Sequence, residues 1–345
     1  MRLINWSVLL GSLALAACNK DKDADTGGQD SDTADSGDTG VDTADSDTSD
    51  SDTGECTVAV TGTVPTADAI DVYYRDTFRV SFDGDGSAAA ISLLDSAGTD
   101  VTTEITWSEG NVQAYVKGDL AALSAYTLHV EECGVTTDIP FLTSDLGTPL
   151  TAGNASLLDH TYMIQLSESD ITTPALLDAI ASEYLTVPLL FNITAVDETS
   201  IDLLGALGYH ENDGSYTQLT SYPTWDFPAG DFSDSPYFSA QADYVTIMYV
   251  DIPIPIEEFY LEGVFTADGN YIQNGKAKGK ADSRFMGPLI NQPEDAYSAF
   301  CDLGASLGIA CEPCADGENY CVYIEAENIT GYYQPGLTLV EVLPA

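Results

Sequence analysis

The segment Thr77-Phe78-Arg79-Val80-Ser81-Phe82, followed by Asp83-Gly84-Asp85-Gly86, carries the pattern that decides the fold. Apolar and polar residues alternate in it, so both Phe side chains and Val80 fall on one face of a half-buried strand. The Asp/Gly run that follows is typical of a turn. This rhythm continues along the chain and predicts a fold dominated by β-structure. Further strands in this part of the chain are expected at 90–95, 101–107, 111–117, 126–131 and 135–143.

Six or seven short strands in about 90 residues are typical of a β-sandwich. Three segments around the first strand occur in a recognisable order: 64–72, 78–82 and Asp95-Ser96-Ala97-Gly98. Together they resemble a bacterial Ig-like domain of the surface-layer type, over most of 60–144. The resemblance implies an Ig-like β-sandwich at 55–146, with Tyr126 in position to form a tyrosine corner. Such modules usually serve as spacers or binding scaffolds.

Successive hairpin patterns in residues 151–345 predict a larger antiparallel β meander with one or two helices. The meander is either closed as a barrel or folded as a sandwich. Turn signals at 212–214 and 268–270 are typical of hairpins. One helix is expected at 174–184, with Thr173 as its cap and Pro174 in its first position. A second helix is expected at 293–307. Strands are expected at 161–166, 187–196, 200–208, 215–221, 244–252, 259–266, 271–281 and 320–327.

The beginning of the chain indicates export. A basic start and the apolar stretch Leu3–Leu15 are typical of a secretory signal. The stretch is too short to span a bilayer, which needs roughly 20 apolar residues. The sequence Leu15-Ala16-Ala17-Cys18 resembles the lipobox of bacterial lipoproteins. This resemblance implies a signal peptide at 1–17, a lipid on Cys18 and anchoring in an envelope membrane. The same resemblance implies sorting to the outer membrane, because Asn19 rather than Asp follows the cysteine. Whether the protein faces the periplasm or the cell exterior is left open.

Residues 18–54 contain 12 Asp among Thr, Ser, Gly and Ala. Such a composition buries too little apolar surface to offset the entropy of ordering, so we expect a disordered stalk behind the lipid anchor. The carboxylates also permit a calcium-binding tract, because oxygen ligands suit hard cations. No loop of the EF-hand type occurs in the segment. The solvated stalk is therefore the favoured interpretation.

Acidic residues exceed basic ones beyond this stalk as well. Subtracting the stalk's 12 Asp and two Lys, and Arg2, from the chain's 56 acidic and 10 basic residues leaves 44 acidic and 7 basic residues over 55–345. The resulting net charge of −37 repels phosphate backbones, so nucleic acid is excluded as a partner.

Six cysteines remain after Cys18, and an even number in an exported protein predicts disulfides. Cys56 and Cys133 flank the first domain and are expected to pair. In the C-terminal group the favoured pairing joins Cys301 to Cys311 and Cys314 to Cys321. The spacing of Cys311 and Cys314 leaves open a four-cysteine zinc site, or a redox pair that lacks its usual βαβ context. This Cys-rich unit resembles one found in uncharacterised lipoproteins of myxobacterial type.

Four of the seven basic residues fall within Lys276–Arg284, and a period of two places Lys276, Lys278 and Lys280 on one strand face. Facing inward, these lysines would line a cavity for an anionic ligand such as a fatty acid. Facing outward, they would pair with the acidic surface or protect a strand edge. The outward orientation is favoured, because buried lysines are rare without partners.

No His-Glu-x-x-His, Gly-x-Ser-x-Gly or P-loop motif occurs in the chain, and its three His are far apart, so no catalytic residue, metal ligand or cofactor is predicted. The sequence therefore predicts a non-enzymatic, lipid-anchored envelope protein that presents its domains for binding or adhesion. A carrier of a small apolar or anionic ligand in the second domain is the alternative, and a glycan-active enzyme is a third. Tyr222, Trp225 and Phe227 are expected in a Pro/Gly-rich loop, where they either stack on a sugar or seal a barrel end.

Overall fold

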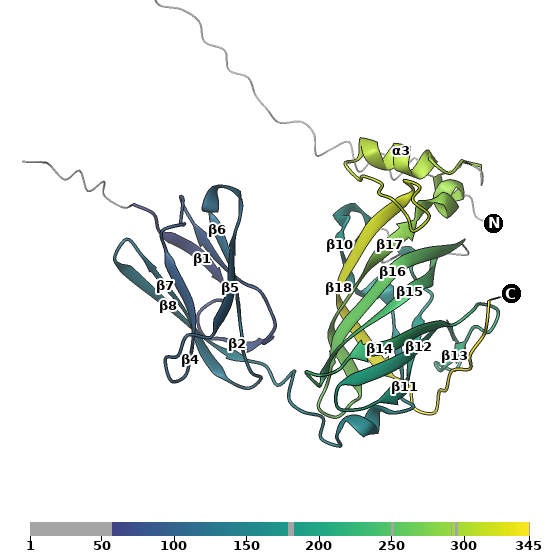
Figure 1. Cartoon of the computed structure of the whole chain (residues 1–345), viewed down its shortest axis with the longest axis horizontal. Coiled ribbons are helices and arrows are strands. Elements are labelled where there is room, and N and C mark those ends of the chain that lie inside the picture. Colours follow the sequence, from purple (N-terminus) through teal and green to yellow (C-terminus); the bar gives the residue numbers. More distant parts are fainter. Residues whose placement is uncertain (1–56, 179–182, 250–251, 291, 294–295, 345) are drawn as a thin grey trace, which may run out of the picture. The chain divides into compact units, whose positions relative to one another are not determined.

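The computed structural model describes residues 57–344, apart from 179–182, 250–251, 291 and 294–295. Strands predominate among them, which confirms the all-β dominated fold (Figure 1). Residues 55–345 form one compact unit, and within it two sets of β-sheets follow one another along the chain. The signal peptide predicted at 1–17, the stalk predicted at 18–54 and Cys18 lie outside the described residues.

The first β-domain is a sandwich of two four-stranded sheets. One sheet has the order β1 (Val60–Val64), β3 (Phe78–Phe82), β6 (Gln113–Gly118), β5 (Thr102–Trp107). The other has the order β2 (Ala69–Val72), β8 (Val135–Thr143), β7 (Ala125–Glu132), β4 (Ala90–Asp95). Neighbouring strands are antiparallel except β2 and β8, which are parallel. A short turn, η1 (Glu109–Asn111), precedes β6.

The strand that decides the fold lies as its pattern predicts. Phe78, Val80 and Phe82 are buried and Arg79 is exposed. The Phe78 ring packs against the ring of Phe141 on the opposite sheet, with 5.1 Å between the ring centroids. The apolar residues that alternate along β3 therefore form part of the core between the two sheets.

Tyr126 closes one corner of this sandwich. Its hydroxyl accepts a hydrogen bond of 2.8 Å from the backbone N–H of Ala121, five residues upstream. That is the contact expected of a tyrosine corner. Membership of the Ig-like family itself stays a prediction.

The second β-domain is built on an eight-stranded barrel. Its strands are β9 (Thr161–Ile164), β11 (Leu189–Val196), β12 (Ser200–His210), β14 (Trp225–Asp231), β15 (Tyr237–Tyr249), β16 (Ile252–Phe265), β17 (Tyr271–Asp282) and β18 (Cys321–Tyr333). The end of β18 pairs with β9, so the sheet closes on itself. Of the two architectures that the sequence left open, the barrel is therefore correct. Two short strands, β10 (Asp170–Thr173) and β13 (Tyr216–Gln218), pair with β18 and β12.

Large side chains fill the described interior of the barrel. Phe238 stacks on Phe265 at 4.9 Å between ring centroids, and Tyr162 lies 5.3 Å from Phe265. Phe191 and Phe227 meet edge to face at 5.6 Å. These buried rings give the barrel a packed core.

Helical segments are short and lie between the strands. They are η2 (Asn154–Leu157), η3 (Leu166–Glu168), η4 (Ala175–Leu177), η5 (Ser283–Ile290) and α3 (Ala299–Ser306). No helix within the described ranges has the length and apolar character to cross a bilayer.

Both helix predictions need correction at their beginnings. Thr173 lies in β10 and Pro174 has an extended backbone, so the predicted cap at 173–174 is wrong, and 179–182 lie outside the described residues. The second helix begins at Ala299 rather than at Pro293. Before it, the Ala296 N–H bonds to the Pro293 carbonyl and the Ala299 N–H bonds to the Ala296 carbonyl.

The strand predicted at 244–252 is correct over 244–249, which belong to β15, but its predicted end is wrong. β15 ends at Tyr249 and β16 begins at Ile252, and these two residues face each other across the hairpin. The connection falls at 250–251, outside the described residues. The apolar run there carries no Asn-Gly or Asp-Gly turn signal, so periodicity alone joined two strands into one.

Candidate functional site

A polar pocket of about 400 Å³ lies where the segment between β2 and β3 meets the outer face of the barrel. The first β-domain contributes Tyr73, Arg75, Asp76 and Thr77. The barrel contributes Tyr237 of β15, Glu262 of β16, Asn274 and Lys276 of β17, and Glu327 and Asn328 of β18. Sequence reasoning had singled out only Lys276 among these residues. The signal it missed is a Tyr-Tyr-Arg-Asp-Thr run placed directly before the strand that decides the fold.

A tight turn holds the segment between β2 and β3. The Asp76 N–H bonds to the Tyr73 carbonyl at 3.1 Å. Tyr74 packs onto Gly147, whose φ of +106° is a backbone angle that glycine adopts without strain. A Cβ atom at Gly147 would collide with the Tyr74 ring, so the glycine allows the close approach that places Tyr73 and Arg75 at the pocket.

Arg75 connects the first β-domain to the barrel. Its guanidinium carbon lies 3.7 Å from the centroid of the Tyr237 ring. It also forms an ion pair with Asp234, in the turn before β15. The guanidinium is thus held by a ring face and by a carboxylate of the barrel.

Glu262 organises the barrel side of the pocket. Its Oε2 atom accepts hydrogen bonds from the hydroxyls of Tyr237 at 2.9 Å and of Tyr260 at 2.8 Å. Burial raises the pKa of Tyr237, and the neighbouring hydroxyl and carboxylate act in the same direction. Tyr237 therefore stays protonated and keeps donating to Glu262.

The three lysines of β17 all point away from the barrel interior. Lys276 donates to Glu327 at 2.8 Å, and Lys280 donates to Glu258 at 2.9 Å. The Lys278 ammonium lies 4.7 Å from the centroid of the Tyr260 ring. The outward orientation is thus the correct alternative. β17 lies between β16 and β18, so its lysines protect no strand edge.

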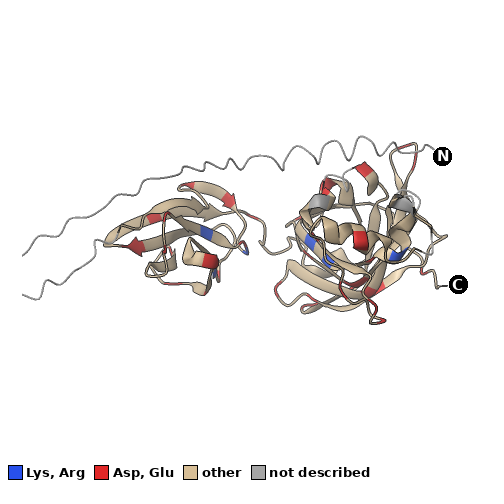
Figure 2. Ribbon diagram, turned by 90° about the horizontal axis from the view of Figure 1, so that it is seen from above, with Lys and Arg blue, Asp and Glu red and all other residues tan. Residues whose placement is uncertain are grey.

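Charge is distributed unevenly around the pocket. Figure 2 shows acidic residues on both β-domains and few basic ones. Two of the seven basic residues of 55–345, Arg75 and Lys276, nevertheless line this one pocket. They face the carboxylates of Asp76, Glu262 and Glu327, so groups of both signs share the site.

The C-terminal cysteines pair as favoured from the sequence. Disulfides join Cys301 to Cys311 and Cys314 to Cys321. Cys133 is disulfide-bonded as well, and Cys56, its predicted partner, lies outside the described residues.

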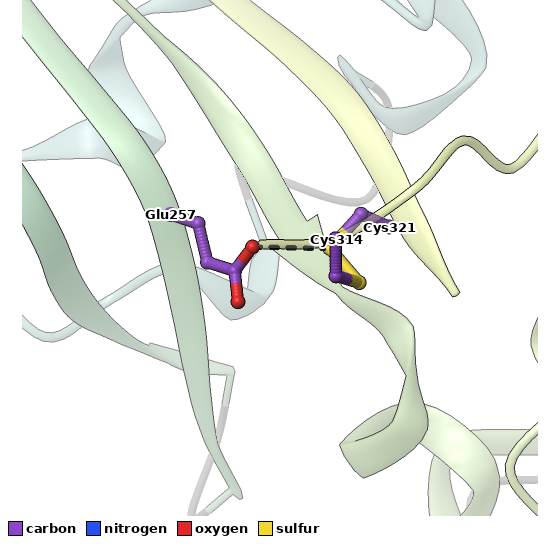
Figure 3. A group of neighbouring side chains, drawn as sticks. All are labelled: Glu257, Cys314 and Cys321. Carbon is purple, nitrogen blue, oxygen red and sulfur yellow. Dashed lines mark hydrogen bonds between the residues drawn. A yellow bond between two sulfur atoms is a disulfide. The ribbon is translucent and has the colours of Figure 1, made fainter. Parts of the chain in front are cut away.

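A carboxylate lies beside the second of these disulfides (Figure 3). The Glu257 Oε2 atom is 3.8 Å from the Cys321 Sγ atom, and it accepts a hydrogen bond of 2.6 Å from the Ala315 N–H. Glu257, Cys314 and Cys321 therefore have ligand atoms close enough to share a metal ion. The two sulfurs are bonded to each other, however, and a disulfide offers no thiolate to zinc. Glu257 thus orders the Cys314–Cys321 turn through its hydrogen bond.

Of the three aromatic residues expected in a loop, Tyr222 lies in one and the other two lie in a strand. Trp225 and Phe227 belong to strand β14 and are 2% and 1% exposed, and Tyr222 packs partly buried against the same core. The Pro and Gly residues around them suggested a loop, but β14 pairs with β12 through Phe227 and Trp225. The sugar-stacking prediction for these residues is therefore wrong, because their rings face the barrel core.

The three His residues occupy separate places. His129 Nδ1 lies 2.6 Å from an Asp138 oxygen on the neighbouring strand. The His160 ring stacks on Tyr333 at 4.0 Å between ring centroids, and burial lowers its pKa. His210 lies beside Tyr216. His129 and His210 contact the neighbouring strand, and His160 lies directly before β9 and contacts β18.

Comparison with known proteins adds little to this description. No family model and no curated protein matches the chain. Among solved structures, CopC from Methylosinus trichosporium OB3b is similar over 25% of this chain and 93% of its own length. The sequence identity is 17% and the TM-score is 0.22.

Proposed function

We propose that this chain is a non-enzymatic lipoprotein of the cell envelope, attached through a lipid on Cys18, which presents its two β-domains for binding. The pocket bounded by Tyr73 and Lys276 is its ligand site. The observation that carries this proposal is the pocket itself, because residues from both β-domains line it and its volume lies within the roughly 300–1,000 Å³ usual for ligand sites.

The barrel interior is the alternative place for a ligand, as a carrier would require. The buried rings of Phe191, Phe227, Phe238 and Phe265 pack against one another there. The lysines that would attract an anion point outward. Both observations favour the outer pocket over the interior.

Native mass spectrometry of the full-length protein, gently released from its membrane, tests the ligand site. Additional mass that disappears on denaturation is expected for the natural chain. Thr77→Trp places a large ring into the pocket, and its exposed position tolerates the larger side chain. Thr136→Trp, at an exposed position of β8 outside the pocket, is the matched control. If Thr77→Trp retains the additional mass as well as the control does, the pocket is not the ligand site.

The membrane anchor is tested separately. Replacing Cys18 with Ser removes the sulfur that would carry the lipid, so the variant is expected to leave the membrane fraction. Separation of inner and outer membranes then checks the location that Asn19 favours. A Cys18→Ser variant that sediments with membranes like the natural protein would contradict the lipid anchor.

A further inference from the structure

We infer that the pocket binds a neutral, hydroxyl-rich ligand, namely a sugar unit of a glycan. This inference rests on the proposed function, because it takes the pocket to be a binding site. It is carried by a division among the polar groups of the pocket: some already form hydrogen bonds or ion pairs within the protein, and others form no hydrogen bond among the described residues.

The charged groups of the pocket are largely paired with the protein itself. Arg75 is held by Asp234 and by the Tyr237 ring. Lys276 donates to Glu327. Glu262 accepts two tyrosine hydroxyls on one oxygen. A charged ligand would have to break one of these contacts in order to gain its own, so its net gain is small.

The remaining polar groups are neutral apart from one carboxylate. Within the described parts of the chain, the side chains of Asp76, Thr77 and Asn274 have no hydrogen-bond partner, although the Asp76 carboxylate is attracted by the charge of Lys276. Asp76 offers acceptors only, whereas the Asn274 amide and the Thr77 hydroxyl both donate and accept. Neighbouring sugar hydroxyls, each a donor and an acceptor, satisfy all three groups together.

Two kinds of charged ligand, anions and quaternary ammonium ions, are disfavoured in this pocket. An anion would meet the carboxylates of Asp76, Glu262 and Glu327, on a unit with a net charge of −37. A quaternary ammonium group would need an open aromatic face. Arg75 already covers one face of Tyr237, and Tyr73 meets Tyr74 edge to face.

The size of the pocket fits this chemistry. Its volume of about 400 Å³ is at the lower end of the usual range for ligand sites, enough for about one or two sugar rings. Asp76 and Thr77 are exposed to solvent, so a chain end can reach them from outside.

An array of immobilised neutral glycans, probed with the full-length protein in detergent, provides the test. Glycine betaine and spermidine, measured by calorimetry, represent zwitterionic and cationic ligands. Binding to at least one neutral glycan is expected, and competition by the matching free disaccharide shows whether the sugar unit alone is sufficient. If neither betaine nor spermidine competes, the ligand is neutral, as inferred.

Asp76→Asn tests the role of the Asp76 carboxylate, which makes no hydrogen bond within the protein's described residues. Loss of a charge-assisted hydrogen bond is expected to weaken glycan binding about tenfold. Asp243→Asn, at an exposed position of β15 outside the pocket, is the matched control and is expected to change affinity less than about twofold. Binding of betaine or spermidine without any glycan would overturn the inference and leave the binding function standing. Glycan binding that Asp76→Asn and Thr77→Trp both leave intact would overturn the assignment of the pocket as well.

Discussion

The central carbon of the Arg75 guanidinium lies over the Tyr237 ring, 3.7 Å from the ring centroid. This contact joins the segment between β2 and β3 to the beginning of β15. The accompanying ion pair with Asp234 contributes less, because the two side chains are 35% and 66% exposed and solvent screens them. The stack on Tyr237 is therefore the larger part of what Arg75 contributes.

Removing this side chain should loosen the connection. Arg75→Ala is expected to lower the free energy of unfolding in urea by about 1 kcal/mol, and Arg75→Lys by less, because lysine keeps the charge but lacks the planar group. Arg79→Ala is the control, because Arg79 is an exposed basic residue of β3. It should change that free energy by less than about 0.5 kcal/mol. Equal losses for Arg75→Ala and Arg79→Ala would show that the stack contributes nothing.

Gly279 of β17 faces the barrel core, opposite to the outward lysines. A Cβ atom there would lie 2.6 Å from Cγ2 of the buried Ile256 and 3.0 Å from the Glu257 carbonyl oxygen. Gly279→Ala is therefore expected to lower the free energy of unfolding by about 1–3 kcal/mol through overpacking. Gly62→Ala is the matched control, because nothing lies within 4 Å of its Cβ position. Thermal unfolding of both variants measures the difference, and similar melting temperatures would refute close packing at Gly279.

Much of the fold could be predicted because alternation specifies burial directly. The strands at Ala90–Asp95 and Val135–Thr143 begin and end where their patterns do. β14 was missed because Pro228, Ala229 and Gly230 interrupt its alternation, and the strand survives by pairing with β12. Whether the sheet closes into a barrel could not be predicted either, because closure depends on the pairing of β18 with β9, and these segments are about half the chain apart.

The site was far less accessible to sequence reasoning. The period of β17 correctly placed Lys276 on a polar face. Its partner Glu327, however, lies on the neighbouring strand β18, 51 residues later in the sequence, and Asp76 belongs to the other β-domain. Asp76 and Asn274 have no local motif around them, so only the tertiary structure brings them to one pocket. The cysteine pairing succeeded because sequence separations of 10 and 7 residues leave short loops that favour neighbouring partners.

Each C-terminal disulfide should contribute to stability by closing its loop. Replacing Cys301 and Cys311 together with Ser, or Cys314 and Cys321 together, is expected to lower the free energy of unfolding by about 2–3 kcal/mol. Chemical denaturation of the two double variants measures this loss. Intact mass should fall short of the reduced chain by a pair of hydrogens per disulfide. A natural protein that retains zinc and carries free thiols at these positions would contradict the disulfide assignment.

Asp268, in the turn between β16 and β17, should give stability a measurable dependence on pH. Its carboxylate accepts hydrogen bonds from the Thr266 hydroxyl at 2.7 Å and the Asn270 N–H at 3.0 Å, and these bonds lower its pKa. A carboxyl group with a lower pKa in the folded state stabilises that state above its unfolded pKa of about 3.9, and this contribution disappears as the pH falls through the folded value. Asp268→Asn is therefore expected to be less stable than the natural protein at pH 7.

The difference between the two proteins should narrow as the pH falls below about 4. Urea denaturation at a series of pH values, in enough salt to screen the general acidic repulsion, isolates this effect from the protonation of other carboxylates. Asp243→Asn, which removes an exposed carboxylate without such a turn, serves as the control. A stability difference for Asp268→Asn that stays constant from pH 7 to 3 would mean that its ionised form gains nothing from the Thr266 and Asn270 hydrogen bonds.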